Sequence, residues 1–137
     1  MSAEASKAAT RDYIEAAWKD IIVGTPSEHD TEATLLRYIS PTVEWQMNGN
    51  SMDFGQLVAF CMNSRATFAD ISIEVTNMVN SEQNGILQSS NRHLCHLKRK
   101  DGSTVSIECI QIIEVGQDGF YTKAVEVART FDDSRDV

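Results

Sequence analysis

Apolar residues recur with a helical period at the start of the chain. Between about Ala3 and Val23, apolar side chains are spaced three or four residues apart, and charged residues fill most of the other positions. This pattern is typical of an amphipathic helix. The turn-forming residues 24–27 (Gly-Thr-Pro-Ser) then end the segment. The chain is therefore expected to begin with a helix that buries one face.

Two further helices and a short strand are expected before residue 69. Asp30 is the expected N-cap of a short second helix that stops before Pro41. An alternating strand at 43–47 is closed by the turn Asn48-Gly49. Asp53, with a glutamine three residues later, predicts a capping box at the start of the third helix. The inner face of that helix is expected to comprise Leu57, Phe60, Cys61 and Ser64.

From residue 69 onward the period of the pattern changes from 3.6 residues to two, which indicates strands. The turn signals are Asp101-Gly102 and, second in strength, residues 117–119. Helices followed by an antiparallel meander predict an α+β fold. We expect one domain over residues 1–137, with a core at about 8–131. The strands are expected at about 69–76, 85–98, 104–115 and 120–131.

The hairpin turns predict which side chains share a face of the sheet. A two-residue turn at Asp101-Gly102 pairs Lys100 with Ser103, and a two-residue turn within 117–119 continues the alternation. A one-residue bulge would exchange the assignments. One face carries Arg92, Leu94, His96, Ile107, Cys109, Gln111, Ile113, Ala124, Glu126 and Ala128. The opposite face carries His93, Cys95, Leu97, Glu108, Ile110, Ile112, Lys123, Val125 and Val127.

Composition narrows the possible partners. The 137 residues carry a formal charge of -8, and such a surface repels nucleic acid. No apolar run approaches the roughly 18 residues of a membrane span, and the first residues lack the apolar segment of a signal peptide. Three cysteines without a CxxC pair favour free thiols, a cytoplasmic location and no metal.

The order of these elements resembles a known superfamily, that of nuclear transport factor 2, ketosteroid isomerase, scytalone dehydratase and the SnoaL-like polyketide cyclases. The resemblance covers about Ala8 to Phe131 and rests on the passage from Pro41 to Gly49, the Asp53 helix start and the meander. It implies a cone-shaped fold, in which the N-terminal helices pack on a strongly curved antiparallel or mixed sheet and close a small-molecule pocket. It also implies a homodimer through the convex face of the sheet.

Within that superfamily, ketosteroid isomerases use a helix tyrosine, a protonated acid on the sheet and a carboxylate base. The resemblance matches the tyrosine to Tyr13, but places Gln111 where the acid would lie and Trp45 where the base would lie. It thereby implies that the sheet face carrying Gln111 is the one that lines the pocket. Because an indole cannot abstract a proton, the usual steroid isomerase mechanism is excluded.

Four side chains are the catalytic candidates, and each has a structural alternative. Glu126 against apolar neighbours would have a raised pKa and could act as a base, or it could form a buried pair with Arg92 bridged by Gln111. His96 could be a general acid or base, or a histidine held by a backbone carbonyl. Tyr13 could donate to an oxyanion together with Gln111, or it could only pack its ring.

The remaining candidates would bind the substrate by shape and apolar area. If the protein is an enzyme, we expect a cofactor-free isomerase, cyclase or dehydratase acting on a hydrophobic, oxygenated compound of polyketide or terpenoid type. The alternative is a ligand-binding or dimerisation module without catalysis. The substrate-binding candidates are Trp45, Met47, Phe60, Arg92, Leu94, Cys109 and Ile113.

Overall fold

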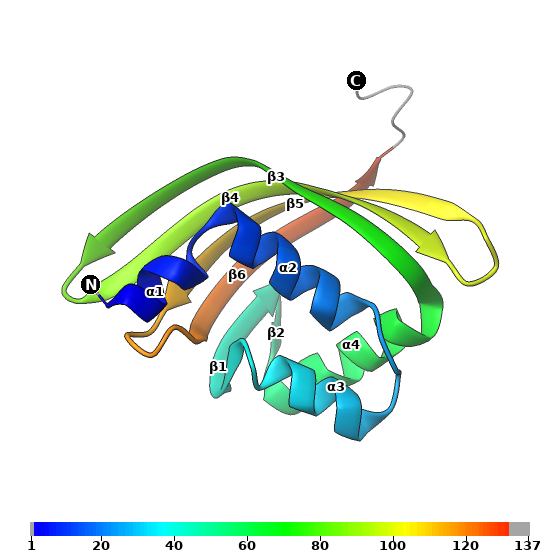
Figure 1. Cartoon of the computed structure of the whole chain (residues 1–137), viewed down its shortest axis with the longest axis horizontal. Helices are drawn as coiled ribbons and strands as arrows, with labels where there is room; N and C mark the ends of the chain where they lie inside the picture. The colour runs from blue at the N-terminus through cyan, green and yellow to red at the C-terminus, as the bar shows by residue number, and fades with distance from the viewer. Residues whose placement is uncertain (1, 132–137) are drawn as a thin grey trace.

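The structure is a computed structural model that describes residues 2–131 and consists of helices packed on one curved sheet (Figure 1). The expected α+β class and the mixed sheet are confirmed. The helices are α1 (Ala3–Ala8), α2 (Arg11–Ile22), α3 (Glu28–Leu35) and α4 (Phe54–Thr67). The strands are β1 (Ile39–Met47), β2 (Asn50–Met52), β3 (Phe68–Gln83), β4 (Ile86–Arg99), β5 (Thr104–Val115) and β6 (Tyr121–Phe131).

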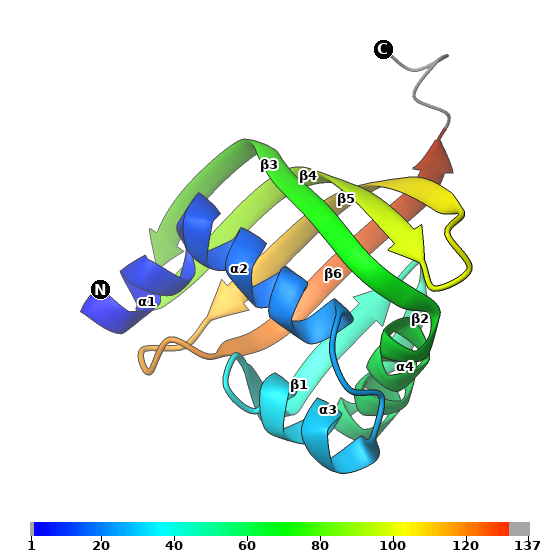
Figure 2. The ribbon, with the colours of Figure 1, turned by 45° about the vertical axis from the view of Figure 1, so that its right-hand side comes forward.

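The sheet has the strand order β2-β1-β6-β5-β4-β3, in which β1 runs parallel to β6 and the other pairs are antiparallel. Its long strands curve around α2, which lies across the concave face, while α3 and α4 close the end beside β1 (Figures 1 and 2). None of the helices at residues 2–131 is long and apolar enough to cross a membrane.

The ends of the helices follow local capping chemistry. The expected first helix is two helices, because the Thr10 side chain accepts a hydrogen bond from the Tyr13 backbone N–H (3.3 Å) and starts α2 afresh. The N-cap of α3 is Ser27 rather than the expected Asp30. The capping box of Asp53 and Gln56 forms as expected, with backbone–side-chain distances of 2.8 and 2.9 Å.

A buried arginine joins the helices to one another. Arg65 on α4 is 3% exposed, and its guanidinium donates to the carbonyl oxygens of Asp20 (2.8 Å), Ile21 (2.9 Å) and Thr25 (2.9 Å). It also donates to Thr34 Oγ1 on α3 (3.0 Å). The guanidinium therefore satisfies carbonyls at the C-terminal end of α2 that have no partner within the helix, and it fixes α2 and α3 against α4.

The turn between β4 and β5 differs from the expected one by one residue. Arg99 N–H donates to Ser103 O (2.8 Å), Gly102 N–H donates to Arg99 O (2.9 Å), and Gly102 has a φ of +92°. These bonds describe a three-residue loop with a glycine bulge rather than a two-residue turn. The pairing therefore shifts by one, so that His93 lies opposite Cys109.

This shift exchanges the two faces of β4. Arg92, Leu94 and His96 were predicted to face the pocket, and that prediction was wrong: they lie on the convex face. Asn91, His93, Cys95 and Leu97 lie on the concave side and are buried.

The turn between β5 and β6 has the same three-residue form, with Gly119 at a φ of +88°. Here a register shift between Glu114 and Val115 restores the alternation, and Gln111 lies opposite Glu126. The predicted faces of β5 and β6 are therefore confirmed.

Candidate functional site

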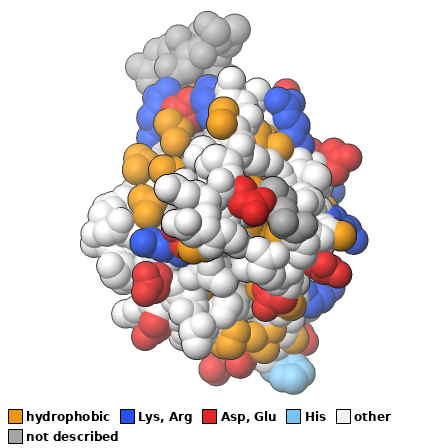
Figure 3. Space-filling model, turned by 90° about the vertical axis from the view of Figure 1, so that its left-hand side faces the viewer, with side chains coloured by type: hydrophobic (Ala, Val, Ile, Leu, Met, Phe, Trp, Pro, Cys, Tyr) orange, Lys and Arg blue, Asp and Glu red, His pale blue; other side chains and the backbone are white. Residues whose placement is uncertain are grey.

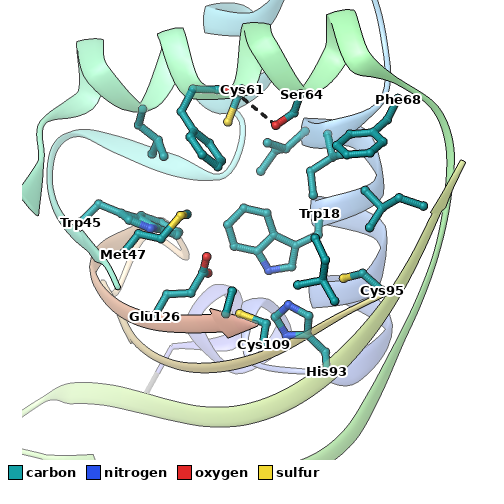
Figure 4. A pocket seen from close by; sticks show the side chains of 17 residues that line it. Trp18, Trp45, Met47, Cys61, Ser64, Phe68, His93, Cys95, Cys109 and Glu126 are labelled. Atoms are coloured by element: carbon teal, nitrogen blue, oxygen red, sulfur yellow. Dashed lines mark hydrogen bonds between the residues drawn. The ribbon is translucent and has the colours of Figure 1, made fainter. Parts of the chain in front are cut away.

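A cavity of about 160 Å³ lies between α2, α4 and the concave face of the sheet (Figure 4). The predicted inner face of α4 is confirmed, because Leu57, Phe60, Cys61 and Ser64 all line it. Phe60 lines the cavity although it is 44% exposed. Five of the predicted site residues line it, namely Trp45, Met47, Phe60, Cys109 and Glu126.

Glu126 is the carboxyl group of this cavity. Its side chain accepts a hydrogen bond from Gln111 Nε2 (2.5 Å) and one from the Cys109 thiol. Burial raises the pKa of Glu126 to about 7, and these two hydrogen bonds oppose the rise. The result is a carboxyl group whose pKa lies near neutral pH.

Glu126 is not paired with the arginine that was proposed as its structural partner. Arg92 Nη2 lies 2.7 Å from Glu108 Oε2 on the convex face, and Arg92 Nη1 donates to Thr76 Oγ1 (2.9 Å). Of the predicted arrangement in which Gln111 bridges Arg92 and Glu126, only the hydrogen bond between Gln111 and Glu126 forms. Within residues 2–131, no cationic side chain neutralises Glu126.

A chain of side-chain amides connects Glu126 to a histidine that was not a candidate. Because Gln111 Nε2 donates to the carboxylate, its Oε1 is left to accept from Asn91 Nδ2 (3.4 Å). Asn91 Oδ1 then faces His93 Nδ1 at 2.8 Å. With the amides assigned in this way, the neutral imidazole carries its proton on Nδ1.

His93 is thereby a hydrogen-bond acceptor in the wall of the cavity. Because its Nδ1 proton is directed at Asn91 Oδ1, the lone pair of the ring is on Nε2. Burial lowers the pKa of His93 to about 4, so the ring is neutral at physiological pH. The predicted histidine, His96, instead bonds to Ser106 Oγ (2.8 Å) on the convex face.

Tyr13, predicted as an oxyanion donor, does not line the cavity. Its ring packs edge-on against Tyr38 (5.8 Å between centroids) and Tyr121 (6.5 Å). Burial raises the pKa of Tyr13 above its ordinary value. Of the predicted binding residues, Ile113 is fully buried in the core instead of lining the cavity, and Leu94 lies on the other face.

No family model and no curated protein matches the chain. Solved structures are similar to it over nearly the whole chain. A nuclear transport factor 2-like protein of unknown function from Exiguobacterium is 20% identical, with a TM-score of 0.56, over 86% of this chain and 97% of its own. The chain has the nuclear transport factor 2-like fold.

Two further structures share this fold. A protein of the SnoaL-like family from Agrobacterium tumefaciens is 11% identical, with a TM-score of 0.56 over 87% of this chain and 97% of its own. A hexachlorocyclohexane dehydrochlorinase is 15% identical, with a TM-score of 0.59 over 94% of this chain and 90% of its own. At these identities the comparisons establish the cone fold, and the chemistry must be argued from the cavity.

In this nuclear transport factor 2-like cone, sequence reasoning missed several cavity residues. Trp18 was not among the site candidates; it belongs to the core and also lines the cavity, edge-on to Trp45, with 5.5 Å between the ring centroids. The signal was present, because Trp18 is one turn before Ile21 and Ile22, which also line the cavity. His93 and Cys95 were missed because the turn before β5 was assigned one residue too short.

All three cysteines of the chain are free and line the cavity. Burial raises the pKa of Cys61 and of Cys95 to about 12 and raises that of Cys109 as well, so the thiols stay protonated. The expected free thiols are confirmed, and the cytoplasmic location inferred from them stays a prediction. In the described part of the chain, no three His, Cys, Asp or Glu side chains could together hold a metal ion.

Proposed function

We propose that the cone interior is a cofactor-independent proton-transfer site, of isomerase, cyclase or dehydratase type, for a small hydrophobic oxygenated compound. The observation that carries the proposal is Glu126, a buried carboxyl group that faces an apolar cavity and has no cationic partner within the described range 2–131. A general base is most effective when its pKa lies near the working pH, and burial raises the pKa of Glu126 to about 7.

The chemistry starts with a C–H bond next to a carbonyl group. The Glu126 carboxylate takes the proton, the C–H electron pair moves into the enolate, and Glu126 then holds the proton as a neutral acid. Returning the proton to another carbon isomerises the compound. Alternatively, Glu126 gives the proton to a departing hydroxyl group, which leaves as water and dehydrates the compound. In a ring closure, the enolate carbon attacks a second carbonyl, and Glu126 gives the proton to the alkoxide oxygen that forms. Gln111 and Cys109 orient the carboxylate through their hydrogen bonds, and His93 Nε2 is a second acceptor in the wall.

The size of the cavity narrows the compound. A cavity of about 150 Å³ in another protein is filled by benzene, and this one measures about 160 Å³. A single-ring compound of terpenoid type therefore fits better than a polyketide with several rings, for which the cone would have to open. The similarity to a dehydrochlorinase supports a reaction that removes a proton from a small ring.

The conversion of 3-cyclohexen-1-one into its conjugated isomer tests the proposal, because it requires loss of the proton next to the carbonyl and is followed by ultraviolet absorbance. Glu126→Gln should lower the rate by about a hundredfold or more. Glu44→Gln, at an exposed site on β1, is the matched control and should leave the rate unchanged. A wild-type rate no faster than buffer, or an equal rate in Glu126→Gln, would contradict the proposal. Binding without turnover would favour the non-catalytic alternative.

We also propose that a second copy of the chain covers the convex face. Its middle strands expose Ile110 (53%), Ile112 (38%), Val125 (37%) and Val127 (58%). Beside this strip lie Arg92, Glu108 and Arg129, joined by ion pairs. A patch that carries both signs of charge around an apolar centre can complement itself across a two-fold axis.

The dimer would have twice the 15.2 kDa mass of the chain in sedimentation or light scattering. Val127→Glu should reduce the mass to that of a monomer, whereas Leu36→Glu, an equivalent change at the C-terminal end of α3, should not. A wild-type monomer at micromolar concentration would refute the dimer.

The end of the molecule seen in Figure 3 shows acidic and basic side chains dispersed among polar ones, without a patch of one sign.

A further inference from the structure

Two buried hydrogen-bond donors in the cavity have no partner among residues 2–131. They are the indole N–H groups of Trp18 and Trp45, whose side chains belong to residues only 7% and 2% exposed. Both residues line the cavity. A buried donor without an acceptor costs free energy, so such groups in a native protein call for an explanation.

The surrounding polar groups make these two donors unusual. Arg65, Tyr121 and Gln111 are buried, and each has a hydrogen-bond partner. Among residues 2–131, one further buried side-chain atom has no hydrogen-bond partner, namely Ser89 Oγ. Ser89 does not line the cavity. Unpaired donors are therefore concentrated where a ligand would lie.

The two rings are held on different elements. Trp18 belongs to α2, and Trp45 on β1 lies between its strand partners Met52 and Ala124. The rings meet edge to face at 83°. Figure 4 shows the nitrogen-bearing edge of Trp18 turned toward the sheet, where Glu126, Cys109 and His93 lie. A ligand in the cavity would thus have indole donors and the Glu126 carboxylate around it.

The lining also selects the charge of the ligand. Among residues 2–131, no lysine or arginine lines the cavity, whereas Glu126 does, so an anionic ligand would be repelled and would lose its hydration without a counter-charge. The indole N–H is a donor only, so the ligand must bring an acceptor. The volume of about 160 Å³ limits the ligand to about one ring.

We infer that the indole N–H groups of Trp18 and Trp45 bind the carbonyl oxygen of a neutral, single-ring compound. The inference deepens the proposed function and rests on it, because it takes Glu126 as the base that removes the proton. When Glu126 takes the proton next to the carbonyl, negative charge develops on the oxygen, and N–H donors directed at it stabilise that charge. The indoles therefore fill the role that the resemblance assigned to Tyr13.

The test uses the fact that the chain contains two tryptophans. A ¹H–¹⁵N spectrum of labelled protein then has two indole cross-peaks, which Trp18→Phe and Trp45→Phe assign. Cyclohexanone and methylenecyclohexane are the titrants, because they share the ring and differ in the acceptor oxygen. Cyclohexanone should shift at least one indole proton downfield and bind about tenfold tighter, as expected for one added hydrogen bond. Cyclohexanecarboxylate should not bind.

The Phe variants should lose the preference for the ketone and still bind methylenecyclohexane. Equal affinities for the two titrants in the wild type, with no indole shift specific to the ketone, would overturn the inference without reference to any variant. Repeating the titration in Glu126→Gln separates the two proposals. If Glu126→Gln still prefers the ketone and still turns over substrate at the wild-type rate, Glu126 is not the base. The assignment of the indole N–H groups as donors to the carbonyl oxygen then stands.

Discussion

Replacing Glu126 by glutamine removes one titrating group from the cavity and should change how stability depends on pH. The folded protein raises the pKa of Glu126 to about 7 from an ordinary 4.5. Between these two values the folded state keeps a proton that the unfolded state has released. The wild type therefore loses stability as the pH rises from 4.5 to 7, by roughly 3 kcal/mol in total.

His93 acts in the opposite direction. Its pKa is lowered to about 4 from 6.5 by burial, so between these values the unfolded state holds the extra proton and stability rises with pH. In the wild type the two effects nearly cancel between pH 4.5 and 6.5. Glu126→Gln removes the contribution of Glu126 to the pH dependence of stability and keeps that of His93. Its stability should rise up to about pH 6.5 and then stay level.

The quantity to measure is the difference in unfolding free energy between Glu126→Gln and the wild type. Urea denaturation at intervals from pH 4.5 to 8.5 provides it by linear extrapolation. The variant should gain roughly 3 kcal/mol relative to the wild type across this range. Glu44→Gln on the exposed side of β1 is the matched control for replacing a glutamate by glutamine. A change below about 1 kcal/mol would refute the raised pKa, and a change of opposite sign would mean that a cation stabilises the carboxylate.

Three further predictions concern other parts of the molecule. Arg65→Lys should lower the free energy of unfolding by about 2–4 kcal/mol, because a lysine ammonium cannot replace a planar guanidinium that donates to four acceptors. The exposed Arg11→Lys is the control, for which a change within about 0.5 kcal/mol is expected. A change that small for Arg65→Lys would contradict the prediction. Asp53→Ala should cost about 1 kcal/mol through loss of the capping box, and an unchanged urea midpoint would argue against the cap. The three thiols, all buried and with raised pKa values, should react with a disulfide reagent only after urea is added; rapid reaction of the native protein would show that the cavity opens.

Much of the secondary structure and one wall of the site could be predicted from local pattern. The spacing of Leu57, Phe60 and Cys61 identified the inner face of α4, and the Asp53–Gln56 pair identified where α4 begins. Glu126 was placed on the face of Gln111 by strand alternation counted from the hairpin turns, and the resemblance assigned that face to the cavity. These inferences succeed because capping and periodicity depend on residues within about one turn or one strand of each other.

The error on β4 shows where local pattern stops being sufficient. Asp101-Gly102 suits a two-residue turn and a three-residue loop alike, since both provide Gly102 with a positive φ. The loop that forms is accompanied by a hydrogen bond from Lys100 N–H to Thr67 O (2.9 Å) at the end of α4. That contact joins segments far apart in the chain, so the sequence near the turn does not reveal it.

What the sequence by itself determined was the α+β order, the helix starts and the apolar faces, because each depends on neighbouring residues. The tertiary structure decided the register. A single extra residue in the first hairpin moved His96 out of the concave side and His93 into it, while the shift at Glu114 compensated for the second hairpin. It also decided that Trp18 and Trp45 meet across the cavity, because only packing α2 against β1 brings the two indoles together. Side chains alternate between the two faces of a strand, so one extra residue in a turn moves every following side chain to the opposite face of the sheet.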